Sequence, residues 1–124
     1  MKSLLPLVGL ALLLTGCGRS TRDSIEQLHA PDASMRLHAV KELENRHGDT
    51  DQVVAALAAA LKDSDAFVRR DAATALGKLG ADAKEAAPAL TTSATKDPNV
   101  QVRKAAAAAL KQVDPDAAVR AKIK

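Results

Sequence analysis

The stretch KDSDAFVRRDAATALGKLG, residues 62–80, decides the fold. It begins with the turn-forming and helix-capping residues Asp63, Ser64 and Asp65. An apolar stripe of helical period follows, made up of Val68, Ala72, Ala75, Leu76 and Leu79. Gly80 is placed to end this helix in a left-handed cap. A helix with one apolar stripe must bury that stripe against other elements, so the flanking sequence determines the architecture.

The same turn and helix occur three times in the chain. Aligning Arg36, Arg69 and Arg103, which are 33 and 34 residues apart, superposes the segments RLHAVKEL, RRDAATAL and RKAAAAAL. A period of this length is typical of stacked helical repeats. Another helix is expected before each copy, over about 21–28, 50–61 and 83–95. In the last of these, Asp82 and Glu85 have the spacing of a capping box, and Pro88 predicts a kink or a late start.

We therefore expect an all-α fold, a short α-solenoid of about three helix pairs. The repeats are predicted at about 22–47, 50–80 and 83–113. A short helix over 115–123 is expected to cap the last repeat, because the final apolar face of a solenoid is otherwise exposed.

The repeated pattern also resembles a known family. Read from Asp63 to Gly80, D-x-x-x-x-V-R-x-x-A-A-x-x-L-G-x-L-G is similar to the short HEAT repeat, of the HEAT-like type also found in phycobilisome lyases. Asp97-Pro98-Asn99 followed by Val102-Arg103 is a second close match. The first copy departs from the pattern, since Ala30 stands where the turn aspartate belongs and Asp32 comes two residues later. The resemblance covers about residues 22–124 and implies the HEAT fold without implying one function.

The resemblance also implies a role for the repeated charges. Asp63, Arg69, Asp97 and Arg103 correspond to a structural ladder that runs along the stack. A carboxylate in the turn can cap the second helix of a pair and meet the next guanidinium through two hydrogen bonds. The alternative is that the row of arginines forms an anion-binding site.

The N-terminal region has the pattern of an export signal. An apolar stretch of 11 residues, Leu4 to Leu14, follows Lys2 and is about half as long as a membrane-spanning helix. It ends in Leu14-Thr15-Gly16-Cys17, which resembles the bacterial lipobox. That resemblance implies a signal peptide over 1–16, a lipid-bearing Cys17 and a tether over 17–21, and the repeat domain expected from the HEAT-like pattern follows over 22–124. The alternative is an ordinary secretory signal in which the only cysteine is incidental.

The same resemblance bears on location. Lipoproteins that stay in the inner membrane commonly carry aspartate after the acylated cysteine, whereas Gly18 stands there in this chain. We therefore expect a lipid anchor in the cell membrane, and the periplasmic face of the outer membrane if the cell has two membranes. Palmitate is among the lipids that such an anchor implies.

Composition argues against several classes of function. Phe67 is the only aromatic residue, so stacking platforms for bases, sugars or flat cofactors are not expected. A net charge of +3 is too small to indicate a nucleic-acid partner. No Ser/His/Asp set or glycine-rich phosphate loop occurs, and we expect no enzyme activity and no cofactor. His38 and Glu42 share a helix face four residues apart, but two candidate ligands are too few to predict a metal site.

The best candidate for binding is the exposed side of the second helices, here called the second-helix face. Its predicted positions include four basic residues and one acidic residue. The candidate contact residues are Lys41, Arg70, Thr74, Lys104 and Lys111. We expect a membrane-anchored adaptor or assembly scaffold of the bacterial envelope that binds an acidic protein partner. The alternatives are a merely solvated face, an accessory protein of an envelope enzyme or cofactor pathway that uses His38 and Glu42, and a structural protein that contacts anionic lipid.

Overall fold

The computed structural model describes residues 18–124, which form seven α-helices and one 3-10 helix and contain no strand. The predicted signal peptide and Cys17 lie outside the described residues. In chain order the elements are α2 (Thr21–Gln27), α3 (Ala33–Glu44), α4 (Thr50–Ala60), α5 (Ala66–Leu79), η1 (Gly80–Ala86), α6 (Ala87–Lys96), α7 (Val100–Val113) and α8 (Pro115–Arg120).

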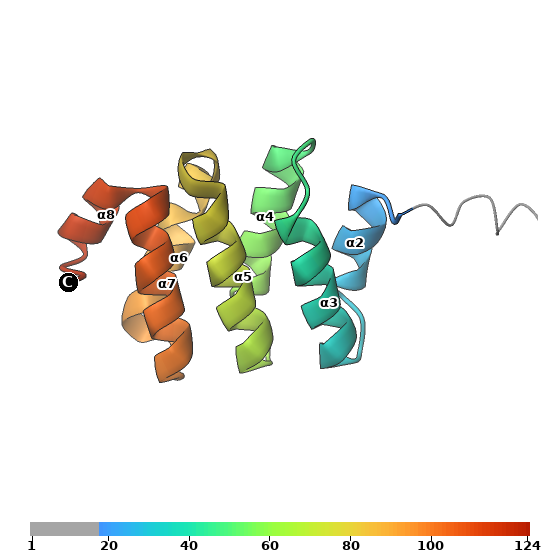
Figure 1. Cartoon of the computed structure of the whole chain (residues 1–124). Coiled ribbons are helices and arrows are strands. Elements are labelled where there is room, and N and C mark those ends of the chain that lie inside the picture. Colours follow the sequence, from blue (N-terminus) through green and yellow to red (C-terminus); the bar gives the residue numbers. More distant parts are fainter. Residues whose placement is uncertain (1–17) are drawn as a thin grey trace, which may run out of the picture.

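The helices stack as pairs along one axis. Figure 1 shows α3, α5 and α7 side by side in one layer, with α2, α4 and α6 behind them and α8 at the far end. The prediction of an all-α solenoid of about three helix pairs with a terminal helix is confirmed. None of the helices that the structure describes is long and apolar enough to cross a lipid bilayer.

The core is built from one leucine per helix and many small residues. Each helix from α3 to α7 contributes one leucine with no exposed surface, namely Leu43, Leu57, Leu76, Leu90 and Leu110. Such burial stabilises by roughly 1.5–3 kcal/mol per leucine side chain. The leucines of α3, α5 and α7 are the three that the repeat alignment superposes, so the period in the sequence corresponds to a row of core contacts.

Small residues allow α5 and α7 to approach closely. A Cβ atom built on Gly77 would come within 3.0 Å of the Cα atom and 3.1 Å of the Cβ atom of Ala109. No other common residue than glycine fits there without moving one of the two helices. The equivalent alanines of the three second helices, Ala39, Ala72 and Ala106, are completely buried.

The first helix of the third pair starts late. Residues 80–86 form the 3-10 helix η1, and α6 begins only at Ala87, with Pro88 in its first turn where a missing N–H is tolerated. The predicted capping box is wrong, because neither η1 nor α6 has a side-chain cap. Gly80 follows α5 with φ +59° but ψ −136°, so the positive φ is as predicted whereas the left-handed helical cap is not formed.

The terminal helix α8 covers part of the last repeat. The Asp114 carboxylate caps it by accepting a hydrogen bond from the backbone N–H of Ala117 at 3.0 Å. Ala117 and Ala118 are buried against the stack, whereas Val119 on the other side is 76% exposed.

Candidate functional site

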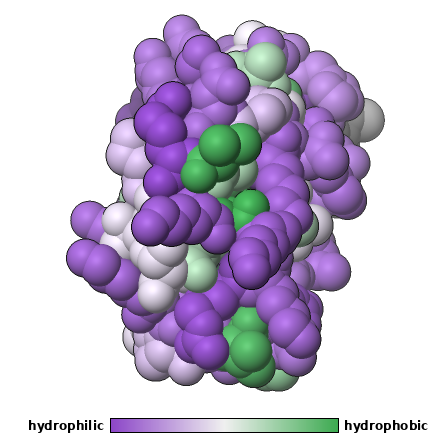
Figure 2. Space-filling view, turned by 90° about the vertical axis from the view of Figure 1, so that its left-hand side faces the viewer, coloured by the Kyte–Doolittle hydropathy of each residue, from purple (hydrophilic) through white to green (hydrophobic). Residues whose placement is uncertain are grey.

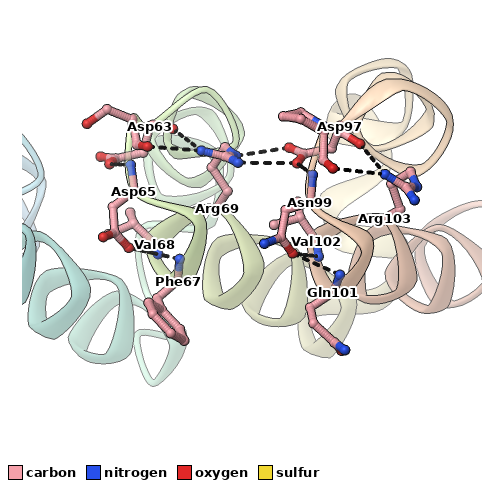
Figure 3. A network of polar contacts seen from close by, with 12 residues as sticks. Asp63, Asp65, Phe67, Val68, Arg69, Asp97, Asn99, Gln101, Val102 and Arg103 are labelled. Atoms are coloured by element: carbon pink, nitrogen blue, oxygen red, sulfur yellow. Dashed lines mark hydrogen bonds and ion pairs between the residues drawn. The ribbon is translucent and has the colours of Figure 1, made fainter.

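Arginine and aspartate side chains connect the three repeats in series. Arg69 donates from Nε and Nη2 to the two carboxylate oxygens of Asp97, at 2.9 and 3.2 Å. Its Nη1 donates to the backbone carbonyls of Asp63 and Ser64, at 2.8 and 3.2 Å. Figure 3 shows this arginine between the turn of its own repeat and the turn of the next one. One guanidinium therefore closes one turn and bonds the following repeat to it.

The same geometry occurs one repeat earlier. Arg36 donates from Nε and Nη2 to the Asp63 carboxylate, at 2.8 and 3.0 Å, and from Nη1 to the carbonyls of Ala30 and Pro31. Arg36 is therefore a further residue of the ladder, in addition to the four residues predicted from the sequence. Each aspartate pairs with the arginine of the preceding repeat, while the arginine six residues after it contacts only its backbone carbonyl.

The helix caps are provided by other residues than the ladder aspartates. Asp65 and Asn99 accept hydrogen bonds from the first backbone N–H groups of α5 and α7. Asp63 and Asp97 instead accept the N–H two residues later and so fix the turn. The expectation that Asp63 and Asp97 cap the second helices is therefore wrong. Asp32, which seemed displaced by two residues, is the N-cap of α3 and is equivalent to Asp65.

The paired carboxylates are almost completely buried. The side chain of Asp97 is 6% exposed and that of Arg69 is 13% exposed. Burial raises the pKa of the Asp97 carboxyl, but the hydrogen bonds from Arg69 and from the Asn99 N–H and the charges of Arg69 and Arg103 outweigh it, so the pKa lies below its usual value. Arg36 makes five hydrogen bonds within the protein and Arg69 makes four, so one N–H of the two guanidinium groups at most is left for an external anion. Arg103 differs, since its Nη1 bonds the carbonyls of Asp97 and Pro98 and no described carboxylate pairs with it.

The second-helix face consists of the exposed sides of α3, α5 and α7. In its first half the predicted basic residues meet acidic ones. Asp71, which is largely buried, accepts from Arg70 at 2.8 Å and lies 3.8 Å from the ammonium of Lys41. The Arg70 guanidinium also lies 5.2 Å from the centre of the Phe67 ring. Asp71 therefore compensates one of the two positive charges predicted for this half, and both Lys41 and Arg70 have it as an ion-pair partner.

The second half of the face is different. The exposed Lys104 forms no ion pair with any described residue, and the Lys111 ammonium bonds only the backbone carbonyl of Lys124. The Thr74 hydroxyl donates to the Arg70 carbonyl of its own helix. Lys78, which the sequence analysis did not include, pairs with Glu44 and links α5 to α3. Among the described residues, the predicted basic side chains of the face that form no ion pair thus lie on α7.

Two hollows run between the helices of this face. One, of about 370 Å³, is polar and lies between α3 and α5, with Lys41, Glu44, Arg70 and Asp71 in its wall. The other, of about 430 Å³, lies between α5 and α7 and is lined mostly by small residues: Gly77, Ala105, Ala108 and Ala109, with Thr74, Lys78 and Gln112. Thr74 and Lys78 line both hollows, which therefore adjoin across α5.

The pair His38 and Glu42 is engaged in contacts within the protein. The two side chains are 3.3 Å apart, and Glu42 also accepts from the buried Ser24 hydroxyl at 2.9 Å and lies 3.8 Å from the Arg19 guanidinium. Among residues 18–124 no group of three or more His, Cys, Asp or Glu side chains could hold a metal ion. The contacts of Glu42 are those of a residue that joins α2 to α3.

The residues that sequence reasoning missed are Asp71 and Lys78. Both lie next to predicted positions on the helical surface, and their charges decide which of the predicted residues are compensated. The spacing of charges along the helices indicated neighbours on one helix, but it could not indicate the contacts from Lys41 to Asp71 and from Lys78 to Glu44, which join different repeats.

Comparisons with known proteins agree with this architecture. A sequence profile described as HEAT repeats matches residues 22–111. The chain is also similar to a solved structure, the complex of CpcE and CpcF of phycocyanin lyase from Nostoc sp. PCC7120, with 31% sequence identity and a TM-score of 0.69. The similarity covers 86% of this chain and 42% of that one, so this chain spans less than half the length of its solved neighbour. The comparison with curated proteins finds no match.

Proposed function

This chain belongs to the HEAT-repeat family, and on that premise we propose that it is an adaptor that holds a segment of a partner protein on its second-helix face. The observation that carries the proposal is the pair of adjoining hollows across α3, α5 and α7. A rigid stack of helices presents such a surface without the need to change shape when a partner binds.

The chemistry of the face favours an acidic segment with small or apolar side chains. The hollow between α5 and α7 has a floor of alanine and glycine, which accepts apolar groups. Lys104, which lies on α7 beside this hollow's alanines in the sequence, forms no ion pair with the described residues. A carboxylate of the partner could therefore pair with it. Arg70 is less suited to this role than the sequence suggested, since Asp71 already neutralises it.

An accessory role beside an enzyme is a second candidate. It rests on the similarity to the phycocyanin lyase structure, which is a complex of two proteins, CpcE and CpcF. In this role the chain would hold or position another protein. The same face would serve both roles, and only the identity of the partner distinguishes them.

We further propose that the chain is held at a membrane through lipid on Cys17, after removal of residues 1–16. The support is the sequence Leu14-Thr15-Gly16-Cys17 and the early start of α2 at Thr21, with Ser20 as its cap. Four residues from Cys17 to Ser20 span at most about 14 Å, so the helical stack would lie close to the lipid surface. Position 18 holds glycine and not the aspartate that commonly signals retention in the inner membrane, which favours a location on the periplasmic face of the outer membrane in a cell with two membranes.

The binding proposal is tested by crosslinking in the cell. A photo-crosslinking residue at Ala108, which is exposed in the hollow between α5 and α7, should yield a defined crosslinked protein by mass spectrometry. The change Lys104→Glu should abolish this crosslink, whereas Lys84→Glu on η1, outside both hollows, should preserve it. Equal crosslinking in both variants would show that the α7 side of the face is not the binding site.

The anchor proposal has a separate test. Cells fed a labelled fatty acid should label the wild-type chain and fail to label Cys17→Ser, and membrane fractionation should follow the label. Continued labelling of Cys17→Ser would refute lipid attachment at this residue without affecting the proposal about binding.

A further inference from the structure

In the ladder of arginines and aspartates, Arg36 and Arg69 each pair with a carboxylate, whereas Arg103 pairs with none among the described residues. Arg36 and Arg69 each bond two turn carbonyls through Nη1 and one carboxylate through Nε and Nη2. Arg103 bonds the two equivalent carbonyls, those of Asp97 at 2.6 Å and of Pro98 at 3.2 Å. In the described residues no carboxylate meets its Nε and Nη2, as Figure 3 shows at the end of the network. The guanidinium is held by its own turn in the orientation that the next aspartate requires.

The same face of α7 is uncovered at other positions too. Val100, Arg103 and Ala107 share one face of the helix, since they are three and four residues apart. Ala107 is partly exposed, whereas the residues aligned with it in the first and second copies, Val40 and Ala73, are completely buried by the repeat that follows. Val100 is 48% exposed. The side of α7 that would meet a fourth second helix therefore has no partner among the described residues.

The terminal helix α8 does not fill this position. It follows the C-terminal end of α7 and has 6 residues, whereas α4 and α6 have 11 and 10. At 1.5 Å per residue α8 is roughly 9 Å long, much shorter than α7 with its 14 residues. Figure 1 shows α8 beside the later turns of α7, away from the turn that precedes it. It takes the place of a shortened first helix, so the position of the second helix stays free.

This end of the molecule has the surface of an interaction site. Figure 2, which views it directly, shows hydrophobic patches separated by hydrophilic side chains. Four large apolar residues are exposed within residues 18–124, and two of them, Val100 and Val119, belong to α7 and α8. Residues 114–124 contain three basic and two acidic side chains, and Arg103 adds a further positive charge. The combination fits a partner that brings a carboxylate and an apolar helix side together.

We propose that this end binds a second helical-repeat protein through a turn and the helix after it, and that an aspartate in that turn pairs with Arg103. The partner differs from this chain, because the first turn of another copy would present Ala30 where the ladder has an aspartate. The aspartates of the other two turns are already paired with Arg36 and Arg69. The site is separate from the second-helix face, so it does not depend on the function proposed for that face.

The chain itself provides a probe for the test. A synthetic peptide of residues 96–113 contains the turn aspartate Asp97, the cap Asn99 and the helix that this fold already places against the preceding repeat. Added to the isotope-labelled mature protein, it should shift amide resonances in α7 and α8 in NMR spectra. A peptide with Asp97→Asn should bind about tenfold more weakly, as expected for the loss of a charged, two-point hydrogen bond.

Protein variants complete the experiment as a double-mutant cycle. Arg103→Gln should weaken binding of the wild-type peptide about tenfold and remove the difference in affinity between the wild-type and Asp97→Asn peptides. Arg103→Lys should behave similarly, since lysine keeps the charge but not the paired donors, and it carries the test if Arg103→Gln fails to fold. Arg120→Gln, which removes an exposed charge from α8, should change binding by less than about twofold.

Four results would overturn the proposal. The first three are the absence of peptide binding, equal binding of the wild-type and Asp97→Asn peptides, and shifts confined to α3 and α5. A loss of binding in Arg120→Gln as large as in Arg103→Gln would also overturn it, because attraction to the overall charge would then explain the binding.

Discussion

Removing one carboxylate of the ladder should destabilise the whole stack. Replacing Asp97 by alanine leaves Nε and Nη2 of Arg69 without acceptors in a site where that side chain is only 13% exposed. Removal of one partner from a fully buried ion pair costs about 3–5 kcal/mol. The guanidinium keeps two turn carbonyls through Nη1, which places the cost at the lower end, about 3 kcal/mol. This is a large part of the 5–15 kcal/mol by which small domains are typically stable.

Urea denaturation at pH 7, followed by circular dichroism at 222 nm, measures this loss. Glu85→Ala, on the exposed surface of η1, is the matched control and should change the free energy of unfolding by less than about 0.5 kcal/mol. The double variant Arg69→Met/Asp97→Ala should lose less than the sum of the two single changes, because no unpaired guanidinium remains. A loss below about 1 kcal/mol for Asp97→Ala, or strict additivity, would refute the view that the pair connects the repeats.

Three further outcomes are expected. Gly77→Ala should lower the free energy of unfolding by about 1–2 kcal/mol, although alanine has the better helix propensity, because the new methyl group meets Ala109. Gly48→Ala is the control and should be close to neutral, since no atom lies within 4 Å of the new methyl group. Thermal unfolding of the two variants compares these effects. The pKa of Asp97 is lower in the folded protein than in the unfolded chain. The ionised carboxylate therefore stabilises the fold fully above the unfolded pKa of about 3.9, and this stabilisation is lost as the pH falls through the lower folded pKa. In an acid titration, Asp97→Asn should therefore lose stability less steeply than the wild type below about pH 4. Leu76→Ala should lower the free energy of unfolding measured in urea titrations by about 3 kcal/mol, since Leu76 is completely buried. A decrease of less than about 0.5 kcal/mol would contradict its place in the core.

The sequence predicts the fold well because the fold depends on a repeated local pattern. The spacing of Arg36, Arg69 and Arg103 and the apolar stripe after each turn require only helical period and stacking. The late start of α6 follows from Pro88, whose ring and missing N–H are tolerated in the first turn of a helix.

The ladder is harder to predict because its bonds join distant residues. Asp63 and Asp97 each stand six residues before an arginine, yet each carboxylate bonds an arginine 27 or 28 residues before it. The same limit applies to Asp71, whose two cations come from α3 and α5. Such pairs depend on how far neighbouring repeats are rotated relative to each other, and that rotation is set by small contacts such as those of Gly77 with Ala109.

The ladder also has a direction, which bears on how a protein of this kind can lengthen. The second repeat carries Asp63, which accepts from the repeat before it, and Arg69, which donates to the repeat after it. A duplicated internal unit of about 34 residues would bring both groups with it and would leave every existing bond intact. A repeat that begins with Ala30 has no acceptor for a preceding arginine, so it is suited only to the first place. A single missing carboxylate thus fixes which repeat stands first in the ladder.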